Sequence, residues 1–318
     1  MRFKHSVSVT INNFSDVLKL LLYKLATGVV FCSIAYVILS LGLKSITGSG
    51  EYRALISEIS SFINALFTGK TEVLQEFQST IGDTFRNFMN IVSSHTGAIV
   101  GCLVGVGLVY LFSRFVNGLS TFAVGNSIND RMSAFARTRF SQAFFRGMGK
   151  AALYQLIYVP ISFVYDALSV TACLLLFIHV PALLFPHRLL TFLFGVSLCV
   201  TGIVCLQALK LTIISAWMPK IITDGLPVGA AFRASFTLRK EFGRRFVGFL
   251  MAVYCIIGIN VFAAVFTVGS ALLITVPMSS VFILSMQFVN HYRANGKKYF
   301  VSINTIRGGE EIPEEGEL

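Results

Sequence analysis

The sequence predicts an all-α fold, a polytopic transmembrane helical bundle of about six spans, and three observations lead to this prediction. The chain has 318 residues, of which 55% are hydrophobic and only 13% are charged, whereas soluble domains carry about 25% charged residues. Its mean hydropathy is +0.74. The apolar residues gather in long stretches, and Lys and Arg are sorted between the segments that join them. Lipid is therefore expected to be the solvent for much of the surface.

A helix needs about 20 predominantly apolar residues to cross the hydrocarbon core of a bilayer. Six stretches of the chain meet this length, at 24–44, 97–116, 157–180, 189–210, 246–266 and 270–290. The third and fourth stretches are joined by a short segment in which Pro181 and Pro186 end one helix and begin the next. The fifth and sixth are separated only by 267–269. Each of these two pairs is therefore expected to form an antiparallel helical hairpin.

The distribution of Lys and Arg predicts the orientation in the membrane. With the N-terminus inside, all but five of the 26 Lys and Arg residues fall in inner segments. The five exceptions are Lys44, Arg53, Lys70, Arg86 and Arg188. Because such residues are retained on the cytoplasmic side during insertion, we expect an integral protein of the cytoplasmic (plasma) membrane with both termini in the cytoplasm.

We expect residues 1–307 to form a single membrane domain with an outer cap at 48–94. Apolar residues at helical spacing form two stripes in this cap, separated at Gly69 and Lys70. They are Ile56, Ile59, Ile63, Leu66 and Phe67, followed by Leu74, Phe77, Ile81, Phe85, Phe88 and Val92. Residues 308–318 are rich in glutamate and poor in apolar side chains, which predicts an acidic disordered tail.

Basic segments with apolar residues at helical spacing precede the first, third and fifth spans. This pattern is typical of helices that lie at the inner headgroup layer and bind anionic lipid through their cations. The cations expected to contact anionic lipid are Arg137, Arg139, Arg146, Lys150, Arg239, Lys240, Arg244 and Arg245. The sequence thus predicts three units, each a basic interfacial elbow helix followed by a helical hairpin.

Asp166 is the only acidic residue inside a predicted span, and ionisable residues within membranes are costly and often functional. Together with Asn260 and Gln287 it could line a substrate or ion path if the three converged. The alternative is a structural contact of Asp166 with Lys210 or Arg114. If the third helix crosses the membrane from Ala151, Asp166 lies near mid-membrane; if the crossing begins near Pro160, it lies just inside the cytoplasmic interface.

The second span carries Gly97, Gly101 and Gly105 at a spacing of four residues. Missing side chains let another helix approach closely, so this pattern predicts a helix-packing face. Its occupant is another helix of the same chain, a membrane-protein partner or a second copy of the chain.

No sequence pattern points to catalysis. The chain has no GxxxxGK[ST] loop, no GxSxG motif and no HExxH motif. We therefore expect no catalytic residues, no metal, no cofactor and no enzyme activity. The net charge of +11 does not predict nucleic-acid binding, because the cations are sorted by membrane side and do not form one patch.

Two functional hypotheses remain from the sequence. The first is a non-enzymatic subunit or scaffold of a membrane complex, which the glycine face, the cap and the basic segments favour. The second is a small permease or lipid-handling transporter that uses Asp166 and the intramembrane amides.

Overall fold

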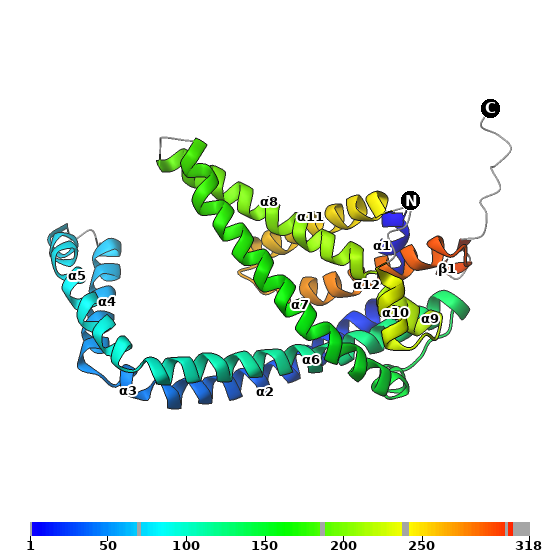
Figure 1. Cartoon of the computed structure of the whole chain (residues 1–318), viewed down its shortest axis with the longest axis horizontal. Helices are drawn as coiled ribbons and strands as arrows, with labels where there is room; N and C mark the ends of the chain where they lie inside the picture. Colours follow the sequence, from blue (N-terminus) through cyan, green and yellow to red (C-terminus); the bar gives the residue numbers. More distant parts are fainter. Residues whose placement is uncertain (1, 69–70, 185–187, 237–241, 303–304, 308–318) are drawn as a thin grey trace. The chain divides into compact units, whose positions relative to one another are not determined.

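The structure, a computed structural model, describes residues 2–68, 71–184, 188–236, 242–302 and 305–307. Within these ranges it is helical apart from its turns and one short two-stranded antiparallel sheet near the C-terminus (Figure 1). The prediction of an all-α fold is therefore confirmed. The predicted acidic tail, 308–318, lies outside the described residues.

The elements follow one another along the chain with short connections. They are α1 (Arg2–Asn12), α2 (Phe14–Gly42), α3 (Lys44–Thr47), α4 (Gly50–Thr68), α5 (Thr71–Ser94), α6 (Thr96–Ala134), α7 (Phe140–Leu184), α8 (Arg188–Ile214), α9 (Trp217–Thr223), α10 (Val228–Ser235), α11 (Phe242–Phe266), α12 (Leu272–Ala294), β1 (Tyr299–Ser302) and β2 (Thr305–Arg307).

Six helical segments among the described residues are long and apolar enough to cross a membrane. They are Phe14–Gly42, Thr96–Ala134, Phe140–Phe177, Leu193–Thr223, Phe242–Phe266 and Leu272–Ala294. Each contains most or all of one stretch that the sequence analysis identified. The most apolar part of α2 is 0% buried and that of α6 is 6% buried. Apolar side chains that face outward over this length indicate an integral membrane protein, with lipid as their surroundings.

The chain divides into two compact units, and the boundary between them falls inside α2 and α6. Unit 1 contains Met1–Leu25 and Arg114–Leu318, and unit 2 contains Ala26–Ser113.

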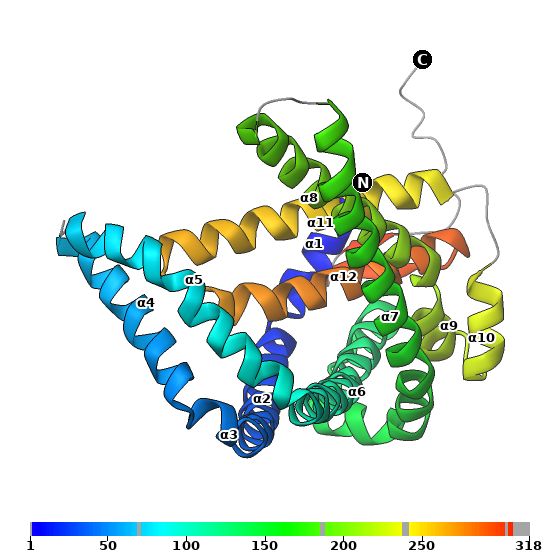
Figure 2. The ribbon, with the colours of Figure 1, turned by 60° about the vertical axis from the view of Figure 1, so that its left-hand side comes forward.

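In unit 2, α2 and α6 lie side by side and run antiparallel (Figure 1). Gly42 allows Cys102 to approach the backbone of α2, and the Cys102 thiol lies 3.7 Å from the carbonyl oxygen of Ile38. The predicted cap forms two helices, α4 and α5, which pack against each other (Figure 2). Thr84 Oγ1 donates a hydrogen bond of 2.7 Å to Glu58 Oε1 between them.

In unit 1, α7 and α8 form one helical hairpin and α11 and α12 form another, as the sequence predicts (Figure 1). Helix α8 also packs against α11, so the two hairpins are neighbours. The turn between α11 and α12 is tight because Gly269 adopts a φ of +83°, in the left-handed region that glycine favours.

The three basic segments that were predicted to form separate elbow helices do not match separate helices of the structure. Helix α6 continues to Ala134, well beyond the predicted end of the second span at 116, and 140–150 forms the first part of α7. The second basic segment is therefore not a separate helix, because nothing in 140–150 breaks the helix before the span begins. The first predicted segment, from Ile11 to Leu21, lies mostly within α2, and the third, from Phe232 to Phe246, begins in α10 and ends in α11. Helix α1 is a separate short helix that packs against α12.

Trp217 is a fully buried member of the apolar core of unit 1. Its side chain is fully buried, and its ring lies 4.7 Å from Tyr154 of α7 and 4.6 Å from Phe232 of α10. The indole Nε1–H donates a hydrogen bond of 3.0 Å to the carbonyl oxygen of Val228. The core thus connects α7, α9 and α10 through one aromatic side chain.

Replacing Trp217 with alanine should lower the free energy of unfolding by about 3–5 kcal/mol, because it leaves a large cavity in this core. The measurement is the thermal midpoint of the detergent-solubilised protein, followed by size-exclusion chromatography after heating. Leu156→Ala is the control, since Leu156 is 65% exposed and should tolerate the change. Equal midpoints for the two variants would contradict the assignment of Trp217 to the core.

Candidate functional site

The candidate site is a polar cluster around Asp166, which lies on α7. Oδ1 of Asp166 lies 2.7 Å from Lys210 Nζ and accepts a hydrogen bond of 3.0 Å from Gln207 Nε2, both on α8. Oδ2 lies 3.1 Å from Arg114 Nη1 on α6. Arg114 also donates from Nη2 to Ser162 Oγ at 3.0 Å. The carboxylate of Asp166 therefore joins its own helix, α7, to α8 through one oxygen and to α6 through the other.

Sequence spacing explains why these side chains meet. Ser162 and Asp166 are four residues apart on α7, and Gln207 and Lys210 are three residues apart on α8, so each pair lies on one face of its helix. The hydrogen bond from Tyr165 to the carbonyl oxygen of Leu206, 2.6 Å long, aligns the same turns of α7 and α8. The packing of the hairpin therefore brings the two polar faces together.

Arg114 and Lys210, the two cations that contact Asp166, lie at the predicted ends of the second and fourth spans. The candidate span on α7, Phe140–Phe177, includes Asp166. The depth of its carboxylate in the membrane stays a prediction.

The cluster is partly enclosed and has an excess of positive charge. The exposed fractions of the side chains are 28% for Asp166, 27% for Arg114 and 9% for Lys210. Asp166 has two cationic partners and an amide donor, and these contacts connect its helix to two others. This arrangement agrees with the alternative in which Asp166 makes a structural contact with Lys210 or Arg114.

The other two residues of the predicted path lie elsewhere. Asn260 on α11 accepts a hydrogen bond of 2.6 Å from Thr275 and donates one of 3.4 Å to Ser279, both on α12. Gln287 lines a pocket near the end of α12. Neither Asp166 nor Asn260 belongs to the lining described for this pocket, and no described contact joins the three residues into one path.

The predicted glycine face is only partly covered. A Cβ at Gly105 would lie 3.2 Å from Ile38 of α2, but at Gly97 and Gly101 nothing described lies within 4 Å. Gly97 and Gly101 are exposed. The packing of α2 against α6 therefore accounts for Gly105 and leaves the rest of the face open.

The predicted lipid-contacting cations lie mostly on the surface. Exposed among them are Arg137, Arg139, Arg146, Lys150 and Arg244. Arg146 forms an ion pair of 2.8 Å with Asp130. Arg245 is only partly exposed and lines the same pocket as Gln287. Arg239 and Lys240 lie outside the described residues.

Two further acidic groups carry interactions that the sequence did not predict. Asp16 is 2% exposed and accepts hydrogen bonds from Ser127 at 2.6 Å and Lys19 at 2.9 Å. Burial raises the pKa of Asp224, but hydrogen bonds from Lys297 and His291 and their charges outweigh burial and hold this pKa below its usual value. Of these contacts, only the one between Asp16 and Lys19 could have been predicted from the sequence, because the two residues are three positions apart on one helix.

A comparison of the chain with protein-family models, with curated proteins and with solved structures finds no match. The class of protein therefore follows from its own features. They define a helical protein with six candidate membrane spans, in which a polar cluster connects α6, α7 and α8.

Replacing Asp166 with asparagine should lower the free energy of unfolding by about 2–3 kcal/mol, because Arg114 and Lys210 lose their shared carboxylate. The value lies below that for a fully buried pair, since the Asp166 side chain is 28% exposed. Thermal midpoints in detergent measure the effect, with the exposed Asp83→Asn as the control. An unchanged midpoint for Asp166→Asn would argue against a structural role.

Proposed function

We propose that the chain is a non-enzymatic, multi-pass subunit or scaffold of a membrane complex. The observation that carries this proposal is the engagement of Asp166 by Arg114, Lys210 and Gln207 between three helices. The permease hypothesis needed Asp166, Asn260 and Gln287 to form one polar path. Asp166 and Asn260 have separate hydrogen-bond partners, and Gln287 lines a pocket that includes neither of them, which favours the subunit hypothesis over the permease hypothesis.

Two surface features support a protein partner. The first is the open part of the glycine face at Gly97 and Gly101, where a second helix backbone could approach closely. The second is the apolar stripe of α4, on which Ile56 and Ile63 are 46% and 45% exposed. Both features lie in unit 2.

We further propose the cytoplasmic membrane as its location, with both termini inside and the α11–α12 turn outside. A reporter enzyme that is active only outside the membrane tests this orientation by fusion at two sites. Fused after Val268, at the turn, it should be active because Val268 is 96% exposed at the proposed outer side; fused after Leu318 it should be inactive. The reverse pattern would overturn the orientation, which rests on the sorting of Lys and Arg.

The partner is tested by native mass spectrometry of the protein extracted from its own membrane in mild detergent. A stoichiometric protein partner is expected in the wild type and should be lost in Gly101→Leu, because the new side chain blocks close helix approach. Gly107→Leu is the matched control, on another face of the same helix and also without described atoms within 4 Å.

Both variants should keep the thermal midpoint of the isolated wild-type chain, since neither glycine is packed against a described residue. A wild-type protein that carries no stoichiometric partner would count against the subunit proposal. A partner that is retained equally in both variants would count against the glycine face as its binding site.

A further inference from the structure

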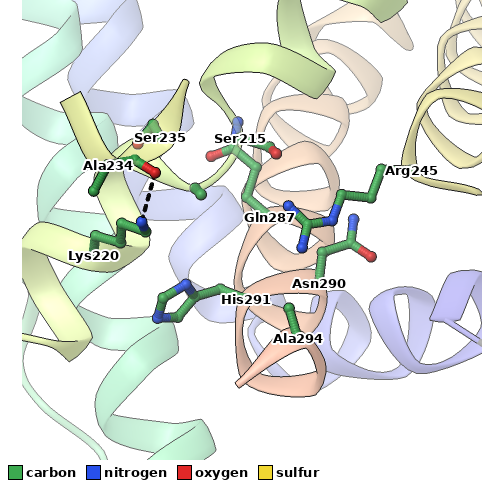
Figure 3. Close-up of a pocket in the computed structure, with 10 residues that line it drawn as sticks. Ser215, Lys220, Ala234, Ser235, Arg245, Gln287, Asn290, His291 and Ala294 are labelled. Atoms are coloured by element: carbon green, nitrogen blue, oxygen red, sulfur yellow. Dashed lines mark hydrogen bonds between the residues drawn. The ribbon is translucent and has the colours of Figure 1, made fainter. Parts of the chain in front are cut away.

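A small pocket that opens to solvent lies at one end of α12, among four helices of unit 1. Figure 3 shows Lys220 of α9 on one side and Arg245 of α11 on the other. Gln287, Asn290 and His291 line it from α12 (Figure 3). The pocket is therefore lined by two cationic side chains from separate helices and by three hydrogen-bonding side chains of α12.

The charge of the lining is positive. None of the lining residues that the structure describes is acidic. Lys220 is 6% exposed and donates a hydrogen bond of 2.8 Å to the carbonyl oxygen of Ala234. A described carboxylate near this lining is Asp224, which lies 3.2 Å from His291 and 2.7 Å from Lys297 and is not part of the lining.

Asn290 provides an independent observation. The residue is 2% exposed, and both its Nδ2 and its Oδ1 are buried without a hydrogen-bond partner among the described residues. Leaving such a group unsatisfied costs about 1–3 kcal/mol. Buried polar atoms of this kind are few in native proteins, and a bound water or ion is one explanation for them. Asn290 and Arg245 both line the pocket (Figure 3).

The position of the pocket fits the headgroup layer of a membrane. Helix α12 spans Leu272–Ala294, and a helix of this length, at about 1.5 Å per residue, crosses the hydrocarbon core of about 30 Å. Asn290 lies in its last turns, next to Arg293 and Lys297. Side chains at this level meet phosphate groups, which guanidinium and ammonium groups bind through charge-assisted hydrogen bonds.

We propose that this pocket binds a phosphate group, carried by a phospholipid headgroup or by a free phosphate anion. Lys220 and Arg245 supply the positive charge, and Nδ2 of Asn290 donates a hydrogen bond to a phosphate oxygen. Oδ1 of Asn290 accepts from a hydroxyl group beside the phosphate. This inference goes beyond the proposed function and stands if the subunit proposal fails.

The test measures the thermal midpoint of the delipidated protein in a neutral detergent. One arm adds sodium phosphate against sodium chloride at equal ionic strength. The other adds phosphatidylglycerol or phosphatidylcholine to the micelles. A ligand that binds the folded state raises the midpoint. A shift with inorganic phosphate identifies a soluble anion, whereas a shift with phosphatidylglycerol alone identifies a lipid headgroup; either result supports the pocket.

Variants of the lining residues test whether the rise in thermal midpoint comes from binding in the pocket. Arg245→Gln and Asn290→Leu should each reduce it by about half or more, because they remove a charge or a donor from the bound phosphate. Arg244→Gln is the matched control, an exposed neighbour with the same change in charge. Asn290→Leu replaces unsatisfied polar atoms with apolar ones, so it should fold at least as stably as the wild type without ligand.

Two results would overturn the proposal. One is a wild-type protein whose midpoint responds to neither inorganic phosphate nor phosphatidylglycerol. The other is a response that is equally large in Asn290→Leu, Arg245→Gln and Arg244→Gln, because it would then arise outside the pocket.

Discussion

The contact between Asp166 and its two cations is the interaction on which the arrangement of α6, α7 and α8 depends. Its oxygens meet Arg114 at 3.1 Å and Lys210 at 2.7 Å. A partly buried charge is costly unless nearby groups satisfy it. The packing of the three helices therefore has to bring these side chains together.

The surroundings of the helices differ along the chain. The most apolar parts of α2 and α6 are almost wholly unburied within the protein and suit contact with lipid. Within unit 1, by contrast, α6, α7, α9 and α10 contribute to the core that contains Trp217. The pocket that we propose to bind phosphate also belongs to unit 1, at the end of α12.

Apolar length and proline positions were enough to predict the spans and the α7–α8 and α11–α12 hairpins. The sequence also offered Lys210 and Arg114 as structural partners of Asp166, and the geometry agrees with that alternative. It did not predict the continuation of α6 to Ala134, because 117–134 mixes apolar and polar residues and resembles a loop. Lys220, Arg245 and Asn290 are far apart in the sequence, so only the packing of α9, α11 and α12 could reveal their pocket.

A double-mutant cycle between Asp166 and Lys210 tests the central claim most directly. It compares the free energies of unfolding of the wild type, Asp166→Asn, Lys210→Met and the double variant. Residues in direct contact within one ion-pair network should show a coupling energy of about 1–3 kcal/mol, with the second substitution much less harmful once the first is present. Effects that add within about 0.5 kcal/mol would contradict the claim that this contact holds α7 and α8 together.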